Sequence, residues 1–96
     1  MARILIVDDD PDIVESVTMV LQKNNHDVIQ AYGGVEGLEK AKSEKPDAMI
    51  LDVMMPDKDG YEVCKELKGD PNYKDIPILL LTAVVSKIPS TSYTHR

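Results

Sequence analysis

The sequence contains no tryptophan and no phenylalanine, and its only aromatic residues are four tyrosines. A core built on large aromatic side chains is therefore excluded, and the interior must be assembled from Val, Ile, Leu, Met and Ala. The single cysteine, Cys64, excludes an internal disulfide bond. A chain of 96 residues has the length of one small domain, which can bury an aliphatic core of this kind.

Long hydrophobic runs and clusters of positive charge are also missing. The apolar run Ile4 to Val7 near the N-terminus is far too short for a signal peptide or a membrane span, so we expect a cytoplasmic protein that makes no membrane contact. Lys and Arg total 11 against 17 Asp and Glu, which gives a net charge of -6. Because a duplex-binding surface needs clustered Lys and Arg, direct binding of nucleic acid is disfavoured.

Segments of two kinds alternate along the chain. Short runs that are typical of buried strands cover residues 4–7, 28–31, 48–53 and 76–81. Between them, apolar residues at helical spacing predict helices that begin at Pro11, at Gly33-Gly34 and at Gly60. In the first of these helices, the predicted apolar stripe consists of Ile13, Val14, Val17, Val20 and Leu21. Strict alternation of strand and helix predicts a doubly wound parallel α/β sheet.

Three acidic residues lie where two of these strands end. Asp8 and Asp9 follow the first strand, and Asp52 lies near the end of the third. In an open parallel sheet, ligands bind beyond the carboxyl ends of the strands, where the strand order reverses. If the first and third strands are neighbours, they run about 4.8 Å apart, and the three carboxylates share one pocket.

Three carboxylates at such close range repel one another, and a hard divalent cation relieves the repulsion. Mg²⁺ prefers oxygen ligands, and it commonly combines one or two carboxylates with water and phosphoryl oxygens. Thr82 ends the fourth predicted strand, where its hydroxyl can donate to a phosphoryl oxygen. The pattern therefore predicts a Mg²⁺ site that receives a phosphoryl group.

The segments ILIVDDDPDI, PDAMILDVMMPDKDG and IPILLLTA resemble the receiver domains of two-component response regulators in residue type, spacing and order. The resemblance runs from Arg3 to about Ala83, and it implies a flavodoxin-like sheet with strand order 2-1-3-4. It implies a signalling domain that accepts a phosphoryl group from a sensor histidine kinase and switches a surface for an unknown output domain or protein. Such a domain is no enzyme for external substrates, although it can catalyse its own phosphorylation and dephosphorylation.

The resemblance also assigns roles to single residues. Asp52 is the implied phosphoacceptor, and Thr82 is the implied switch residue that contacts the phosphoryl group. Asp8 and Asp9 are the acidic pair that organises Mg²⁺, with Asp9 as a direct ligand. Asp52 and the backbone carbonyl of Met54 complete the implied metal site. The turn that shapes the phosphorylation loop is matched by Pro56, Asp59 and Gly60.

The sequence departs from the family after its fourth strand. The family continues through a fourth helix, a fifth strand that carries a lysine before a proline, and a fifth helix, whereas 13 residues follow Ala83 here. We therefore expect an incomplete receiver-like domain over residues 1–83 and a divergent or truncated tail over residues 84–96. Lys87 follows Thr82 too closely to end another crossover, so it is not assigned as the family lysine. An open edge on the fourth strand permits a homodimer, through that edge or through exchange of the tail.

Two other functions stay open at this point. A degenerate receiver would be an interaction module that works without phosphorylation. A Mg²⁺-dependent phosphohydrolase similar to the haloacid dehalogenase family would use Asp8 as the nucleophile, with Asp10 at the expected Asp-x-Asp spacing. That family continues with Gly-Thr or similar residues, whereas Pro11-Asp12 follows here. The position of a phosphoryl label, on Asp8 or on Asp52, distinguishes the hydrolase from the receiver.

Overall fold

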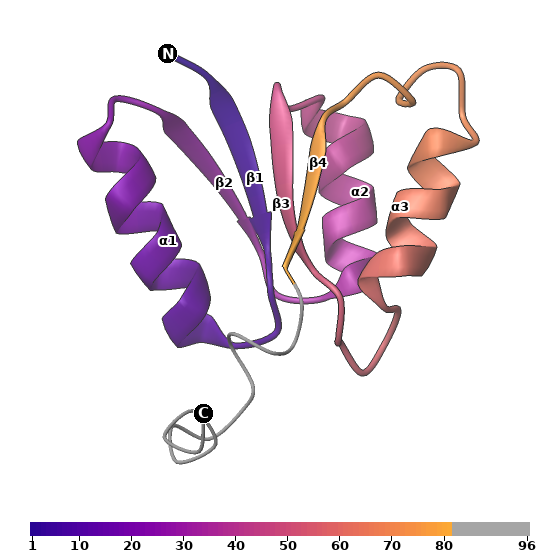
Figure 1. Ribbon diagram of the computed structural model, residues 1–96, viewed down its shortest axis with the longest axis horizontal. Helices are drawn as coiled ribbons and strands as arrows, with labels where there is room; N and C mark the ends of the chain where they lie inside the picture. Colours follow the sequence, from indigo (N-terminus) through magenta and orange to yellow (C-terminus); the bar gives the residue numbers. More distant parts are fainter. Residues whose placement is uncertain (82–96) are drawn as a thin grey trace, which may run out of the picture.

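The computed structural model describes residues 1–81, which form a four-stranded parallel sheet with helices on both faces (Figure 1). The strands are β1 Arg3–Val7, β2 Asp27–Ala31, β3 Ala48–Asp52 and β4 Ile78–Leu81. The helices are α1 Pro11–Lys23, α2 Gly34–Glu44 and α3 Gly60–Lys68. The sheet order β2-β1-β3-β4 confirms the predicted flavodoxin-like topology for this part of the chain.

The direction of the crossovers places α1 on one face of the sheet and both α2 and α3 on the other (Figure 1). The chain moves from β1 outward to β2 and then returns past β1 to β3, so right-handed connections must cover opposite faces. The strand order reverses between β1 and β3, where Val7 pairs with Leu51. The residues that follow this pair therefore leave the sheet next to each other.

The buried core lies between the sheet and the helices α2 and α3. It is entirely aliphatic, as the composition predicts, and consists of Leu5, Val7, Ala31, Ala41, Met49, Leu51, Met55, Val63 and Leu67. Gly37 allows α2 to approach β1 closely, because a Cβ atom at this position would come 2.7 Å from Cγ1 of the buried Val7. The helix α2 thus lies close to β1, the strand that Asp8 and Asp9 follow.

The predicted apolar stripe of α1 is wrong at one position. Val20 is 59% exposed, whereas Thr18, a polar residue, is buried together with Val14. Thr18 is tolerated there because its hydroxyl accepts a hydrogen bond of 3.0 Å from the side-chain amide of Gln30 on β2. The buried face of α1 therefore includes Thr18, whereas Val20 is in contact with solvent.

The strand β4 is shorter than the predicted run over residues 76–81. Ile76 still belongs to the preceding turn, because its N–H donates to the carbonyl of Tyr73 at 3.1 Å. Pro77 follows and has no N–H to donate, so the regular strand starts at Ile78. None of the helices in the described region is long and apolar enough to cross a membrane.

An open apolar hollow lies beside β4, over the ends of β1 and β3. It is lined by Ile4, Ala48, Met49, Ile50, Pro77, Ile78 and Leu79. Leu79 is 60% exposed, although it occupies a strand of the central sheet. The predicted homodimer would cover such a surface, and it stays a prediction, since the structure contains a single chain.

Two leucine substitutions test this distribution of burial. Leu5→Ala removes a fully buried side chain and should lower the free energy of unfolding by about 2 to 5 kcal/mol. Leu79→Ala should cost about 0.5 kcal/mol or less, because the side chain is largely in water already. Urea denaturation followed by circular dichroism measures both values. Equal losses in the two variants would show that Leu79 is covered in solution, and would contradict the exposed face described above.

Candidate metal centre

The three predicted carboxylates meet at the carboxyl edge of the sheet. Asp8 follows β1, Asp9 is next to it, and Asp52 is the last residue of β3. One carboxylate oxygen from each residue lies within 4.8 Å of the other two. Asp8 and Asp52 are completely buried, whereas Asp9 is half-buried and reaches the surface. The structure thus forms an acidic cluster that opens to solvent on the side of Asp9.

The turn between β1 and α1 fixes the position of Asp8. Its N–H donates to the carbonyl of Ala31 at 3.2 Å, and its Oδ1 accepts from the N–H of Asp10 at 3.0 Å. Asp10 is the N-cap of α1, and its own carboxylate accepts from the N–H of Asp12 at 2.9 Å. The acidic cluster therefore contains Asp9 and not Asp10, so the Asp8–Asp10 pairing that a phosphohydrolase of the alternative type needs gains no support.

The chemistry of the cluster favours a hard divalent cation. Burying carboxylates next to one another is costly, both because they lose water and because like charges repel. All three donors are carboxylate oxygens, which suit Mg²⁺ and leave room for water or phosphoryl oxygens in its coordination sphere. The residues present therefore fit the metal that the sequence predicts.

The loop after Asp52 returns the chain sharply to α3. Gly60 begins this helix, and its N–H donates to the carbonyl of Val53 at 2.8 Å. A Cβ atom at Gly60 would come 2.3 Å from the carbonyl oxygen of Asp52, so a side chain is excluded here. Asp59 is the N-cap of α3 and accepts from the N–H of Glu62 at 2.9 Å. Asp59 and Gly60 thus take part in the turn that the resemblance assigned to them.

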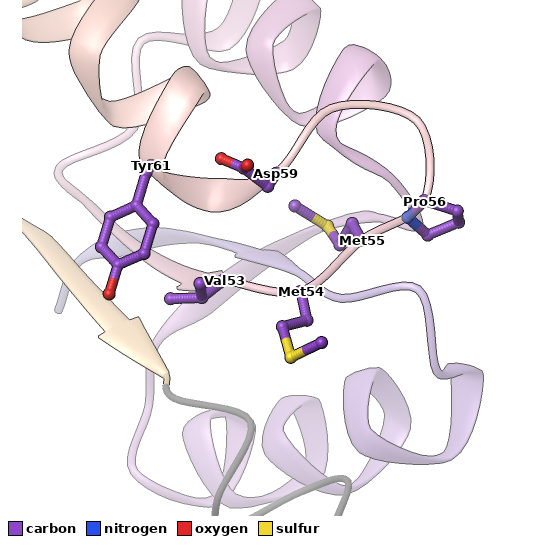
Figure 2. Close-up of a pocket in the computed structure, with 6 residues that line it drawn as sticks. All are labelled: Val53, Met54, Met55, Pro56, Asp59 and Tyr61. Atoms are coloured by element: carbon purple, nitrogen blue, oxygen red, sulfur yellow. The ribbon is translucent and has the colours of Figure 1, made fainter.

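Figure 2 shows that the side chains of Met54 and Met55 leave this loop in opposite directions. Met55 enters the core, whereas Met54 is 58% exposed. Met54 borders an open, mainly apolar hollow of about 470 Å³ that is lined by Val53, Met54, Met55, Pro56, Asp59 and Tyr61 (Figure 2). Tyr61 stands on the first turn of α3 and is 61% exposed. An apolar surface thus lies directly beside the loop that follows Asp52.

Asp57, in the same loop, binds the start of α2, and the sequence did not predict this contact. Its two carboxylate oxygens accept hydrogen bonds of 3.0 Å from the N–H groups of Gly34 and Val35 at the start of α2. The N–H of Val35, followed by that of Gly34, lowers the pKa of the Asp57 carboxyl below its usual value. The adjacent Gly33-Gly34 pair is the sequence signal that could have revealed this approach, because glycine often marks close contact between backbones.

Part of the predicted site and the predicted tail fall outside the part of the chain that the structure describes. Thr82, Lys87 and the tail over residues 84–96 are outside the described residues. The role of the Met54 carbonyl as a metal ligand stays a prediction. The acidic cluster of Asp8, Asp9 and Asp52 is therefore the part of the predicted site that the structure brings together.

Comparison with known proteins gives a consistent result. The sequence pattern of a family described as the response regulator receiver domain matches residues 4–92. The response regulator MprA of Mycobacterium tuberculosis is 51% identical over 81 residues, which cover 84% of this chain and 34% of that protein. RpaA of Synechocystis, described as a DNA-binding dual master transcriptional regulator, is 45% identical over 84 residues, or 88% of this chain and 35% of that protein. The chain thus spans about a third of the length of these relatives.

A similar solved structure is the response regulator TrrA of Thermotoga maritima, crystallised in complex with Mg²⁺-BeF. It superposes with a TM-score of 0.81 and 38% sequence identity, over 97% of this chain and 80% of that one. The parallel sheet, its strand order and the sequence match agree with the resemblance found in the sequence. The chain belongs to the family of response regulator receiver domains.

Proposed function

We propose that the chain is the receiver module of a two-component phosphorelay and accepts a phosphoryl group on Asp52 in the presence of Mg²⁺. The observation that carries this proposal is the convergence of Asp52 with Asp8 and Asp9 within 4.8 Å, at the carboxyl edge of a receiver fold. Asp52 is the cluster member at the end of β3, at the point where the strand order reverses. The complex of the relative TrrA with Mg²⁺-BeF also supports the choice of metal.

The proposed step is transfer from a phosphohistidine of a sensor histidine kinase. A carboxylate oxygen of Asp52 attacks phosphorus and forms an O–P bond, while the P–N bond breaks and its electron pair stays on the imidazole nitrogen. Asp8, Asp9 and Asp52 would hold the metal together with the carbonyl of Met54. Mg²⁺, when bound, neutralises the charge that the carboxylates and the phosphoryl oxygens bring together. The remaining contribution of the chain is to hold Asp52 beside Asp8 and Asp9 at the carboxyl edge of the sheet.

The product is an acyl phosphate on Asp52, which would shift a two-state surface toward the form that an output partner binds. Thr82 is the proposed contact of the phosphoryl group. The net charge of -6 argues against nucleic-acid binding by this domain itself. The DNA binding that the description of RpaA states would belong to the part of such a regulator that this chain does not span. A cytoplasmic location is part of the same proposal.

Phosphoryl labelling tests the assignment of Asp52. Incubation with acetyl phosphate and Mg²⁺, followed by borohydride trapping and peptide mass spectrometry, should place the modification on Asp52 and nowhere else. Asp52→Ala should lose the label. Asp47→Ala should retain the label, because Asp47 precedes β3 at the end of the strand opposite to Asp52. Its carboxylate accepts from the N–H of Arg3 at 2.8 Å.

The alternatives predict different results in this experiment. A label on Asp8 that persists in Asp52→Ala would contradict the receiver mechanism and support a phosphohydrolase. An unmodified wild-type chain would instead favour a module that works without phosphorylation.

The metal requirement gives a second prediction. A cation that binds only the folded state stabilises it, by about 2.7 kcal/mol when its concentration is a hundred times Kd. Mg²⁺ should therefore raise the thermal midpoint of the wild type. Asp9→Asn should remove most of that increase and should also raise the midpoint of the metal-free protein, because one of three mutually repelling charges is gone. Differential scanning calorimetry measures both effects, and an equal response of the two proteins to Mg²⁺ would exclude Asp9 from the metal site.

A further inference from the structure

Asp57 belongs to the loop between β3 and α3, but its carboxylate is bound to a different element. Oδ1 accepts from the N–H of Gly34 and Oδ2 accepts from the N–H of Val35, each at 3.0 Å. The first N–H groups of a helix have no partner within the helix, and the positive end of the helix dipole favours an anion there. A residue 23 positions away in the sequence thus caps α2.

A second observation shows that the loop is pressed against the start of α2. A Cβ atom at Gly34 would come 1.9 Å from the carbonyl oxygen of Lys58. A Cβ atom at Gly33 would come 3.0 Å from Oδ2 of Asp57. Gly34 is therefore required for the backbone of the loop and the first turn of the helix to touch, and Gly33 leaves room beside it for the Asp57 carboxylate.

The contact of Asp57 with α2 lies within the loop between Asp52, the end of β3, and Gly60, the start of α3. One end is continuous with β3 at Asp52, and the other is fixed by the bond from the N–H of Gly60 to the carbonyl of Val53. Between these ends, the buried side chain of Met55 holds the loop from the inside. Asp57 holds it from the outside, on the exposed surface.

We propose that Asp57 is a positioning residue for the metal centre: by tying the loop to the N-terminus of α2, it fixes where the Met54 carbonyl stands relative to Asp52. This inference rests on the proposed function, in which that carbonyl is a metal ligand. The N–H groups of Val35 and Gly34 lower the pKa of the Asp57 carboxyl, and its two oxygens accept one hydrogen bond from each. Outer residues that orient metal ligands affect metal affinity even when they do not touch the metal.

The experiment compares the Mg²⁺ affinity of the wild type, Asp57→Ala and Asp47→Ala by isothermal titration calorimetry, at one temperature where all three are folded. Asp47 is a matched control, since it is also an exposed carboxylate that accepts a backbone N–H, but at the opposite edge of the sheet. We expect Asp57→Ala to raise Kd about tenfold, which is the lower end of the effects of residues that orient a metal ligand. Asp47→Ala should leave Kd unchanged, even where it lowers the thermal midpoint as much as Asp57→Ala does.

Asp57→Asn provides a second variant that disturbs the fold less, because it keeps one acceptor oxygen for one of the two N–H groups. Its Kd should lie between those of the wild type and Asp57→Ala. A lowered thermal midpoint with the wild-type Kd, in either variant of Asp57, would show that this residue only caps the helix and would overturn the inference. Failure of the wild type itself to bind Mg²⁺ would instead overturn the proposed function.

Discussion

The architecture depends on the burial of two carboxylates on neighbouring strands. Asp8 and Asp52 have no exposed surface, and the pairing of Val7 with Leu51 brings them side by side. Such an arrangement opposes folding, since each charge loses water and repels the other. The aliphatic core around β1 and β3 has to supply the free energy that holds these residues in place. A strongly acidic edge is thus retained at the expense of stability, as is common for functional sites.

The same edge gathers the N-terminal ends of the three described helices, and each of them begins with an aspartate as an acceptor. Asp10 caps α1, Asp59 caps α3, and Asp57 binds the first N–H groups of α2. The positive ends of three helix dipoles therefore lie at the carboxyl edge of the sheet, and each has an aspartate carboxylate as its acceptor. Aspartate thus serves as the acceptor at the start of all three described helices, which agrees with the excess of acidic residues in the composition.

Much of this arrangement can be predicted from the sequence, because it follows from local patterns and from the rules of parallel sheets. The predicted helix that begins at Gly60 is observed, and the strand-end positions of Asp8, Asp9 and Asp52 brought them together as expected. Tertiary contacts account for the failures. Thr18 on α1 can be buried because its hydroxyl accepts a hydrogen bond from Gln30 on β2. The periodicity of the sequence does not reveal a pair of this kind.

The contact between Asp57 and α2 was missed for the same reason, since Asp57 and Gly34 are 23 residues apart and no local pattern relates them. The glycines at positions 33 and 34 appeared to be only a helix start, whereas the lack of a side chain at Gly34 is what admits the loop. Local patterns thus predict which acidic residues form the cluster, but not the long-range contacts of the loop beside it.

The glycines of α2 have one further consequence, for the dynamics of the domain. The helix has only 11 residues and contains Gly37 in its interior, where glycine lowers the intrinsic stability of a helix by about 1 kcal/mol relative to alanine. Its order therefore depends on tertiary contacts, among them those with Val7 and with the loop that contains Asp57. Release of that loop and fraying of the first turn of α2 then become a single opening event, which amide hydrogen exchange at Gly34 and Val35 would register.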